Sequence, residues 1–296
     1  MKVFGRTLLA FCTLPLLWCT IMAVVNRRTE VTEALPVHAR TIALGDSHIG
    51  CSVDPKVLTG SENIALAAEP YLLSWLKLRH IIAHHRVDTV ILGFAPHNLS
   101  DKDHRKFHDN GWATERLLKR LYPLTTIGEA VQLPLYKQTY ARTLFMNYCT
   151  VPHPTHITYI GHYSGLGAKY HADSAATYAR HFMEKDSTVA PISAYGIACL
   201  DSIVALTTRD HIALYLVGAP LHASYRRNVP AEYKTRYADL SVRYADEGVH
   251  VIDRTALFQG DSLFANSDHL NGRGARRFTR ELLQILRPVP DSTVAH

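Results

Sequence analysis

The sequence predicts an α/β protein with a doubly wound, mainly parallel sheet. Short apolar runs rich in β-branched residues alternate along the chain with longer segments in which apolar residues recur at helical spacing. Gly, Pro or Asp bound these runs, as is usual for parallel strands that helices bury on both faces. The chain has 296 residues, 47% of them hydrophobic, which is enough for one large core. We therefore expect one domain with helices on both faces of a sheet.

The first segment is an N-terminal apolar stretch. Residues 7–25 carry no charge over 19 positions, and Lys2 and Arg6 precede them. This length can cross a bilayer as one helix. Cleavage after Ala23 is the alternative, but Ile21 is large for the small-residue pattern of a signal peptidase site. We expect an uncleaved transmembrane anchor.

The rest of the chain divides into a tether and a large domain. We assign residues 1–28 to the membrane anchor and residues 29–40, which are polar and contain Pro36, to the tether. The α/β domain then covers residues 41–290. Basic residues flank both ends of the anchor, so charge does not determine its orientation. We expect a single-pass protein of the cell membrane with the domain outside the cytoplasm, in the periplasm.

Strands and helices alternate within this domain. Four strands are expected, over residues 41–45, 89–94, 211–220 and 249–253. Apolar residues at helical intervals predict helices between and after them, over residues 71–85, 192–208 and 275–286. This alternation supports the doubly wound sheet.

A long insertion interrupts the alternation between residues 100 and 190. It is rich in His and Tyr, and its pattern predicts short helices over residues 113–123 and 140–148. Insertions of this length between sheet elements are often lids or binding surfaces. A purely structural subdomain is the alternative, and the sequence leaves both open.

Composition excludes several classes of partner and cofactor. The 32 Lys and Arg residues exceed the 26 Asp and Glu residues, and the net charge of +6 is too diffuse for nucleic-acid binding, although it favours an anionic polymer or surface. The five cysteines form no CxxC pair, and the histidine-rich stretches lack the ligand spacing of a closed zinc site. We expect no metal, no cofactor and no nucleic-acid partner.

A polar motif stands where the first strand ends. The tetrapeptide Gly45–His48 directly follows the apolar run, at the edge of the sheet where open α/β folds bind ligands. Its serine, Ser47, is either a nucleophile or the N-cap of the next helix, because a serine hydroxyl readily bonds the free backbone N–H groups there. On Ser47 alone, the cap is the more frequent outcome.

Two further motifs follow later strands. Asp268 and His269 lie in the loop between the last strand and the last helix, and His97 and Asn98 follow the strand expected at residues 89–94. The carboxyl ends of parallel strands open on one edge of the sheet, so His269 and Ser47 are expected there together. A serine hydroxyl becomes a nucleophile only when such a base removes its proton.

The order Ser, Asn, Asp-His, with each motif after a strand, resembles the SGNH/GDSL hydrolase superfamily. The resemblance covers residues 38–100 and 211–286 and implies a flavodoxin-like, three-layer α/β/α fold. The tetrapeptide Gly45–His48 is similar to the first family motif, with His48 where the family often has leucine. Residues 63–71 resemble the second motif.

The resemblance implies roles for individual residues. Ser47 is the nucleophile, His269 is the general base, and Asn98 matches the asparagine of the third motif. The family spacing Asp-x-x-His puts Asn266 at the acidic position, whereas the neighbouring Asp268 carries the charge that stabilises an imidazolium. We favour Asp268 on charge, while spacing favours Asn266.

Three donors are expected to form the oxyanion hole. They are the backbone N–H of Ser47, a backbone N–H at Ala67 or Ala68, and the side chain of Asn98. The family usually has a glycine in the neighbourhood of Ala67 and Ala68, so the alanine departs from its pattern. Candidates for the lining of the pocket are Asp46, His48 and His97.

Anchored relatives in the superfamily imply the function. The layout is similar to the alginate acetylation proteins and to the D-alanyl transfer protein of teichoic acid synthesis. The resemblance therefore implies a serine acyltransferase or esterase that acts on O-acyl groups of a cell-surface polysaccharide, with a membrane-bound O-acyltransferase as partner. Transfer and hydrolysis differ only in whether a sugar hydroxyl or water attacks the acyl-serine. The alternative is a catalytically impaired binding or scaffold subunit of an acylation or export complex.

Overall fold

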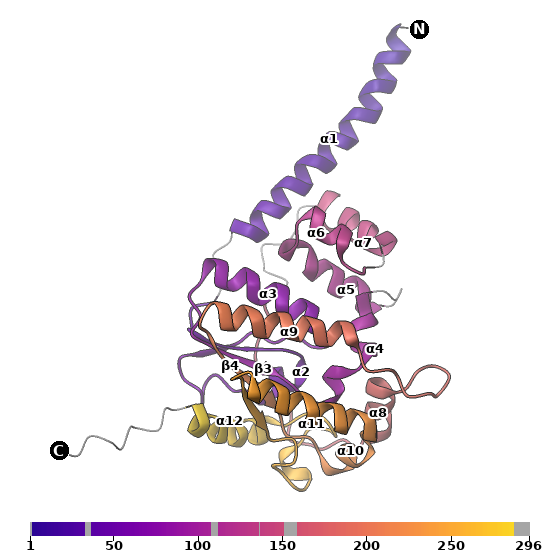
Figure 1. Ribbon diagram of the computed structural model, residues 1–296. Helices are drawn as coiled ribbons and strands as arrows, with labels where there is room; N and C mark the ends of the chain where they lie inside the picture. Colours follow the sequence, from indigo (N-terminus) through magenta and orange to yellow (C-terminus); the bar gives the residue numbers. More distant parts are fainter. Residues whose placement is uncertain (1, 33–36, 108–111, 136, 151–158, 287–296) are drawn as a thin grey trace, which may run out of the picture. The chain divides into compact units, whose positions relative to one another are not determined.

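The computed structural model describes residues 2–32, 37–107, 112–135, 137–150 and 159–286 (Figure 1). These residues form two compact units. The helical unit comprises Met1–Pro36, Leu76–His84 and Arg105–Ile160, and the sheet unit comprises Val37–Trp75, His85–His104 and Gly161–His296. The predicted insertion is therefore divided, because its first residues, up to His104, and its last part, from Gly161 onward, belong to the sheet unit.

One parallel sheet organises the sheet unit. Its strand order is β2-β1-β3-β4-β5, and all four neighbouring pairs are parallel. The strands are β1 (Thr41–Leu44), β2 (Ser61–Asn63), β3 (Thr89–Gly93), β4 (Ala213–Gly218) and β5 (His250–Asp253). The predicted fold class is confirmed, as are the four predicted strands, although each is shorter than expected.

Strand β2 was not predicted, because its sequence, Ser-Glu-Asn, has no apolar pattern. It lies at the edge of the sheet, and its side chains form hydrogen bonds in place of apolar contacts. The amide of Asn63 donates to the backbone carbonyls of Ile49 and Val53 at 2.9 and 2.8 Å. These bonds hold the helix after β1 against the edge strand.

Helices cover both faces of the sheet. On one face, Ile49 of α2 (Ser47–Ser52) and Phe278 of α12 (Gly272–Leu286) share an apolar core with Ala43 and Ile91 of the strands. The opposite face is covered by α9 (Ala194–Arg209) and α11 (Ala231–Asp246). Figure 1 shows α9 and α12 on opposite sides of β3 and β4.

Helix α11 has the 3.6-residue periodicity but was not predicted, because tyrosines carry its apolar face. Its buried residues are Tyr233, Tyr237, Leu240 and Tyr244. The rings of Tyr237 and Tyr244 pack on Phe94 at centroid distances of 4.7 and 6.0 Å.

The remaining elements of the described chain are shorter. Predicted helices that are confirmed here are α3 (Tyr71–His84) and α5 (Trp112–Leu121). The expected helix over residues 140–148 is the end of α7 (Lys137–Leu144) followed by the π-helix η4 (Phe145–Cys149). The others are α4 (Asp101–His104), α6 (Ile127–Gln132), α8 (Ser174–Phe182), α10 (Ala223–Asn228), η1 (Pro96–Leu99), η2 (Arg105–Phe107), η3 (Tyr122–Leu124) and η5 (Asp261–Leu263).

The N-terminal helix, α1 (Lys2–Thr32), is longer than predicted. Its stretch Val3–Asn26 is long and apolar enough to cross a membrane, as an anchor or as a signal sequence. The helix continues into the expected tether because no Gly or Pro follows until Pro36. Tether residues 33–36 and the domain end at 287–290 lie outside the described residues.

Candidate active site

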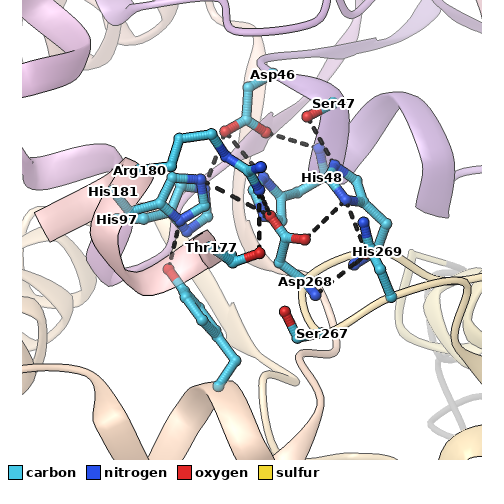
Figure 2. A network of polar contacts seen from close by, with 12 residues as sticks. Asp46, Ser47, His48, His97, Thr177, Arg180, His181, Ser267, Asp268 and His269 are labelled. Atoms are coloured by element: carbon cyan, nitrogen blue, oxygen red, sulfur yellow. Dashed lines mark hydrogen bonds and ion pairs between the residues drawn. The ribbon is translucent and has the colours of Figure 1, made fainter. Parts of the chain in front are cut away.

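Ser47 lies at the first position of α2, just beyond the carboxyl end of β1. The N-cap of α2 is Asp46, whose Oδ1 accepts a hydrogen bond from the backbone N–H of His48 at 2.9 Å. The interpretation of Ser47 as a helix cap is therefore wrong. Its hydroxyl oxygen instead lies 2.8 Å from Nε2 of His269, 222 residues later in the chain (Figure 2).

A glycine at the end of β1 makes this position accessible. Gly45 has a φ of +125°, and a Cβ atom there would lie 3.1 Å from the backbone nitrogen of Gly93 at the end of β3. A larger residue would be strained in this conformation and would push the two strand ends apart. The glycine thus lets the chain turn sharply from β1 to Ser47.

The other ring nitrogen of His269 has two oxygens within reach. Nδ1 lies 3.1 Å from Oδ1 of Asn266 and 3.0 Å from Oδ1 of Asp268, but only the asparagine oxygen lies in hydrogen-bond geometry. Asn266 Oδ1 also accepts the backbone N–H of His269 at 2.8 Å, which identifies it as the amide oxygen. Since this oxygen only accepts, Nδ1 carries the proton and Nε2 is left to accept from the Ser47 hydroxyl.

Asp268 is buried and surrounded by nitrogen groups. Its Oδ2 accepts a hydrogen bond from Arg180 at 2.9 Å and lies 3.3 Å from Nε2 of His48 and 3.7 Å from Nε2 of His181. Burial by itself raises the pKa of Asp268, but His269 and His48 outweigh it and hold the pKa well below its usual range. Asp268 is therefore ionised next to the imidazole of His269.

Asp46 is a second buried carboxylate on the other side of His48. Its Oδ2 accepts hydrogen bonds from Nε2 of His97 and from the side-chain amide of Asn98, both at 2.9 Å. Burial raises the pKa of Asp46, but the neighbouring His48 and His97 lower it well below the ordinary value. Asn98 is fixed from both ends, since its Oδ1 accepts the backbone N–H of Ala95 at 2.9 Å.

His48 lies between the two carboxylates, at ion-pair distance from both but outside hydrogen-bond geometry. Its Nδ1 lies 3.1 Å from Oδ2 of Asp46 and its Nε2 lies 3.3 Å from Oδ2 of Asp268. Its ring stacks on that of His269, with centroids 4.8 Å apart and an interplanar angle of 15° (Figure 2). Burial lowers the pKa of His48, but the two carboxylates overcome this and raise it to about 10. The raised pKa favours the protonated form of His48, whose ring lies against that of His269.

Two side chains of α8, Arg180 and His181, complete the cluster. The ring of His181 stacks on His97 with centroids 4.9 Å apart, and its Nδ1 lies 2.6 Å from the hydroxyl of Tyr225. Burial and the adjacent His97 hold the pKa of His181 well below its usual value. Sequence reasoning missed Arg180, His181 and Tyr225, and the only available signal was the histidine content of the insertion.

The predicted oxyanion-hole alanines lie in the turn after β2. The backbone N–H of Leu66 donates to the carbonyl of Gly45 at 3.0 Å, so this turn lies beside the end of β1. Ala67 is exposed and Ala68 is half-buried. Ala68 has a φ of +59°, a left-handed conformation that favours glycine. The backbone at Ala68 therefore has a glycine-like conformation even though the side chain differs.

Two groups of donor atoms in the described part of the chain are close enough to hold a metal ion. Within each group the donor atoms lie within 4.8 Å of one another: Asp46, His48 and His97 in one, and His48, His181 and Asp268 in the other. Hydrogen bonds from His97 and Arg180 already reach the carboxylate oxygens concerned. Arg180 also lies 2.9 Å from Oδ2 of Asp268, so one carboxylate of the second group already has a cationic partner.

Comparison with known proteins gives distant structural likenesses. No family model and no curated protein matches the sequence. A solved structure of a Streptococcus pneumoniae protein, provisionally described as a platelet activating factor, aligns with 96% of this chain and 99% of its own, at a TM-score of 0.42 and 10% identity. A provisionally described acylhydrolase from Bacteroides fragilis aligns with 91% of this chain and 99% of its own, at a TM-score of 0.37 and 9% identity. Likenesses as distant as these carry no argument about chemistry, so the chemistry of the site is inferred from its own residues.

Proposed function

We propose that the protein is a serine acyltransferase or esterase that acts on ester-linked acyl groups through an acyl-serine intermediate. The observation that carries this proposal is the 2.8 Å contact between Ser47 Oγ and His269 Nε2. It is supported by the tautomer of His269, whose Nδ1 proton points to an acceptor-only oxygen. A serine with a base in this state has the arrangement that nucleophilic catalysis requires.

The geometry supports a two-step reaction. In the first step His269 Nε2 takes the proton of Ser47 as Oγ attacks the ester carbonyl, and the imidazolium then returns that proton to the departing alcohol. In the second step water or a sugar hydroxyl attacks the acyl-serine, and His269 moves the proton from the attacking oxygen to Ser47. The buried charge of Asp268 stabilises the imidazolium in both steps, while Asn266 fixes the ring orientation.

Backbone and amide donors would stabilise the tetrahedral intermediates. The proposed donors are the N–H of Ser47, a backbone N–H at Ala67 or Ala68, and the amide of Asn98. One amide hydrogen of Asn98 is bonded to Asp46, which leaves the second one for the oxyanion. Each donor of this kind contributes about 3 to 4 kcal/mol to lowering the barrier.

We further propose that α1 anchors the protein in the cell membrane with the sheet unit in the periplasm. The apolar stretch Val3–Asn26 supports anchoring. An enzyme held there would meet O-acylated polysaccharides of the cell surface, and a membrane-bound O-acyltransferase would be a suitable acyl donor. Reaction with purified O-acetylated polysaccharides, with acetate release and transfer to acceptor sugars measured separately, tests this substrate class.

A fluorophosphonate probe and p-nitrophenyl acetate test the catalytic proposal. We expect the full-length protein to be labelled and to hydrolyse the ester, and we expect Ser47→Ala to abolish both. Ser202→Ala is the matched control, because Ser202 is half-buried on α9, away from the site, and its hydroxyl donates to the helix carbonyl of Ala198 at 2.8 Å. Repeated silence of the folded wild-type protein would favour the scaffold alternative instead.

A further inference from the structure

The segment after α7 packs against α1 within the helical unit. The indole N–H of Trp18 donates to the backbone carbonyl of Thr150 at 3.1 Å, and the amide of Asn26 donates to the carbonyl of Tyr148 at 2.9 Å. Asn26 and Tyr148 are both buried. The π-helix η4 is therefore fixed alongside the second half of the apolar helix, whose N-terminal half projects beyond the other helices of the unit (Figure 1).

This contact has a definite level along the apolar stretch. Trp18 lies eight residues before Asn26, the last residue of that stretch, which is about 12 Å along a helix. The hydrocarbon core of a bilayer is about 30 Å thick, so a helix that spans it with Val3–Asn26 has Trp18 below the membrane surface. A segment bonded to Trp18 reaches the same depth.

The exposed side chains of this segment suit such a position. Phe145 and Met146, which are adjacent in η4, are 51% and 56% exposed. Large apolar groups that are exposed together in water are unfavourable, and in soluble proteins such patches mark interaction surfaces. Contact with lipid would remove them from water.

The backbone carbonyl groups in and around this segment have hydrogen-bond partners within the protein, as an apolar medium requires. Four of its carbonyl groups accept hydrogen bonds from side chains: Thr143 from Asn147, Met146 from Thr150, Tyr148 from Asn26 and Thr150 from Trp18. Backbone groups in hydrocarbon must be satisfied within the protein, because no water replaces a missing partner. Side chains thus supply partners where the α-helical bonding ends.

We propose that η4 is seated in the membrane interface and contacts the lipids that surround α1. This inference rests on the proposed anchoring by α1 and adds a second point of attachment. The seat would restrict the tilt of the helical unit relative to the bilayer, as a single spanning helix does not. Its occupant is lipid of the same membrane.

Nitroxide labels in reconstituted full-length protein test the seat. Cys12→Ala, Cys19→Ala and Cys149→Ala remove the accessible thiols, while Cys51 and Cys199 are buried. Single labels are then attached at Leu14→Cys, Met146→Cys or Val242→Cys in vesicles of phosphatidylcholine and phosphatidylglycerol. Val242 is the matched control, since it is 62% exposed but lies on α11 of the sheet unit. Collision rates with oxygen, which enters hydrocarbon, are compared with those of a water-soluble nickel chelate.

We expect the oxygen-to-nickel ratio at Met146→Cys to exceed that at Val242→Cys several-fold and to approach that at Leu14→Cys. Fluorophosphonate labelling of Ser47 in each variant checks that the protein remains folded, and a label at Phe145→Cys repeats the measurement beside Met146. If Leu14→Cys reports hydrocarbon and Met146→Cys matches Val242→Cys, anchoring stands and the seat is refuted. If Leu14→Cys also matches Val242→Cys, α1 is not inserted and both proposals are refuted.

Discussion

The two buried carboxylates of the site, Asp46 and Asp268, face the same histidine but belong to different environments. Asp46 receives its hydrogen bonds from the ends of β1 and β3, through the His48 backbone and the side chains of His97 and Asn98. Apart from the shared His48, the partners of Asp268 come from the insertion and from its own loop. The difference suggests a division of labour in which Asp46 holds the edge of the sheet in place and Asp268 supplies charge to the base.

Asp268→Asn gives the largest expected effect. The substitution keeps the shape of the side chain but removes the charge that stabilises the His269 imidazolium. We expect kcat for p-nitrophenyl acetate to fall by about 10³- to 10⁴-fold, as in serine triads that lose their carboxylate. Urea unfolding of the variant serves as the control for folding. An unchanged kcat would mean that His269 obtains its charge stabilisation elsewhere.

We expect Asp46→Asn to lower the free energy of unfolding while leaving the reactivity of Ser47 in the folded protein largely unchanged. Removing one partner of a buried ion pair leaves the other charge uncompensated, which typically costs about 3 to 5 kcal/mol. We expect urea unfolding to show a loss of this size, with folded protein still labelled by the fluorophosphonate probe. The contrast between the two carboxylates disappears if Asp46→Asn stays stable but loses labelling.

His48→Gln tests the charge between the carboxylates through pH. The pKa of His48 is raised to about 10 in the folded protein, against about 6.5 for an ordinary histidine. Its stabilising contribution is therefore complete below pH 6.5 and is lost as pH rises toward 10. In that window the unfolding free energy should fall by at most about 1.4 kcal/mol per pH unit.

Urea unfolding at several pH values in the presence of a chelator measures this slope. The difference between the wild type and His48→Gln isolates the contribution of His48, since other histidines titrate in both proteins. Parallel pH dependences for the two proteins would show that His48 is neutral between its carboxylates.

Asn266→Ala gives the smallest expected effect. The substitution removes the oxygen that accepts the Nδ1–H of His269 and so fixes its tautomer. Asp268 Oδ1 remains 3.0 Å from His269 Nδ1 and can accept a hydrogen bond in its place. We expect kcat to fall about tenfold or less, the value of one lost orienting hydrogen bond. A loss larger than that of Asp268→Asn would show that the hydrogen bond to Asn266 matters more to the reaction than the charge of Asp268.

The sequence predicts which residues meet at the carboxyl edge of the sheet, because that prediction depends only on the topology of a parallel sheet. Parallel strands open on one side, so motifs after β1 and β5 were expected to meet, and Ser47 and His269 lie 2.8 Å apart. The alternative that Ser47 caps the helix is wrong, since Asp and Ser are equally good caps and only the backbone shows that Asp46 takes this position.

The residues and elements that the sequence did not predict share a physical reason. Arg180 and His181 come from α8, in an insertion whose position relative to the sheet depends on long-range packing that no local pattern encodes. The edge strand β2 is polar, and α11 uses tyrosine where a periodic pattern of aliphatic residues would be recognised. Hydrophobic periodicity identifies elements buried by aliphatic side chains and overlooks those fixed by hydrogen bonds or amphipathic rings.

Helix α12, described above as part of one face of the sheet, has a consequence for the timing of synthesis. Its Thr279 accepts a hydrogen bond from the backbone N–H of Asp54 and donates one to the carbonyl of Ser52, so it closes against the end of α2. Contacts between residues so distant along the chain form late, because the intervening loop must first be closed. Ser47 leaves the ribosome early, and His269 follows 222 residues later. A nascent chain that ends before residue 269 carries Ser47 without the imidazole that faces it, so the pair forms only when the last part of the sheet unit has been made.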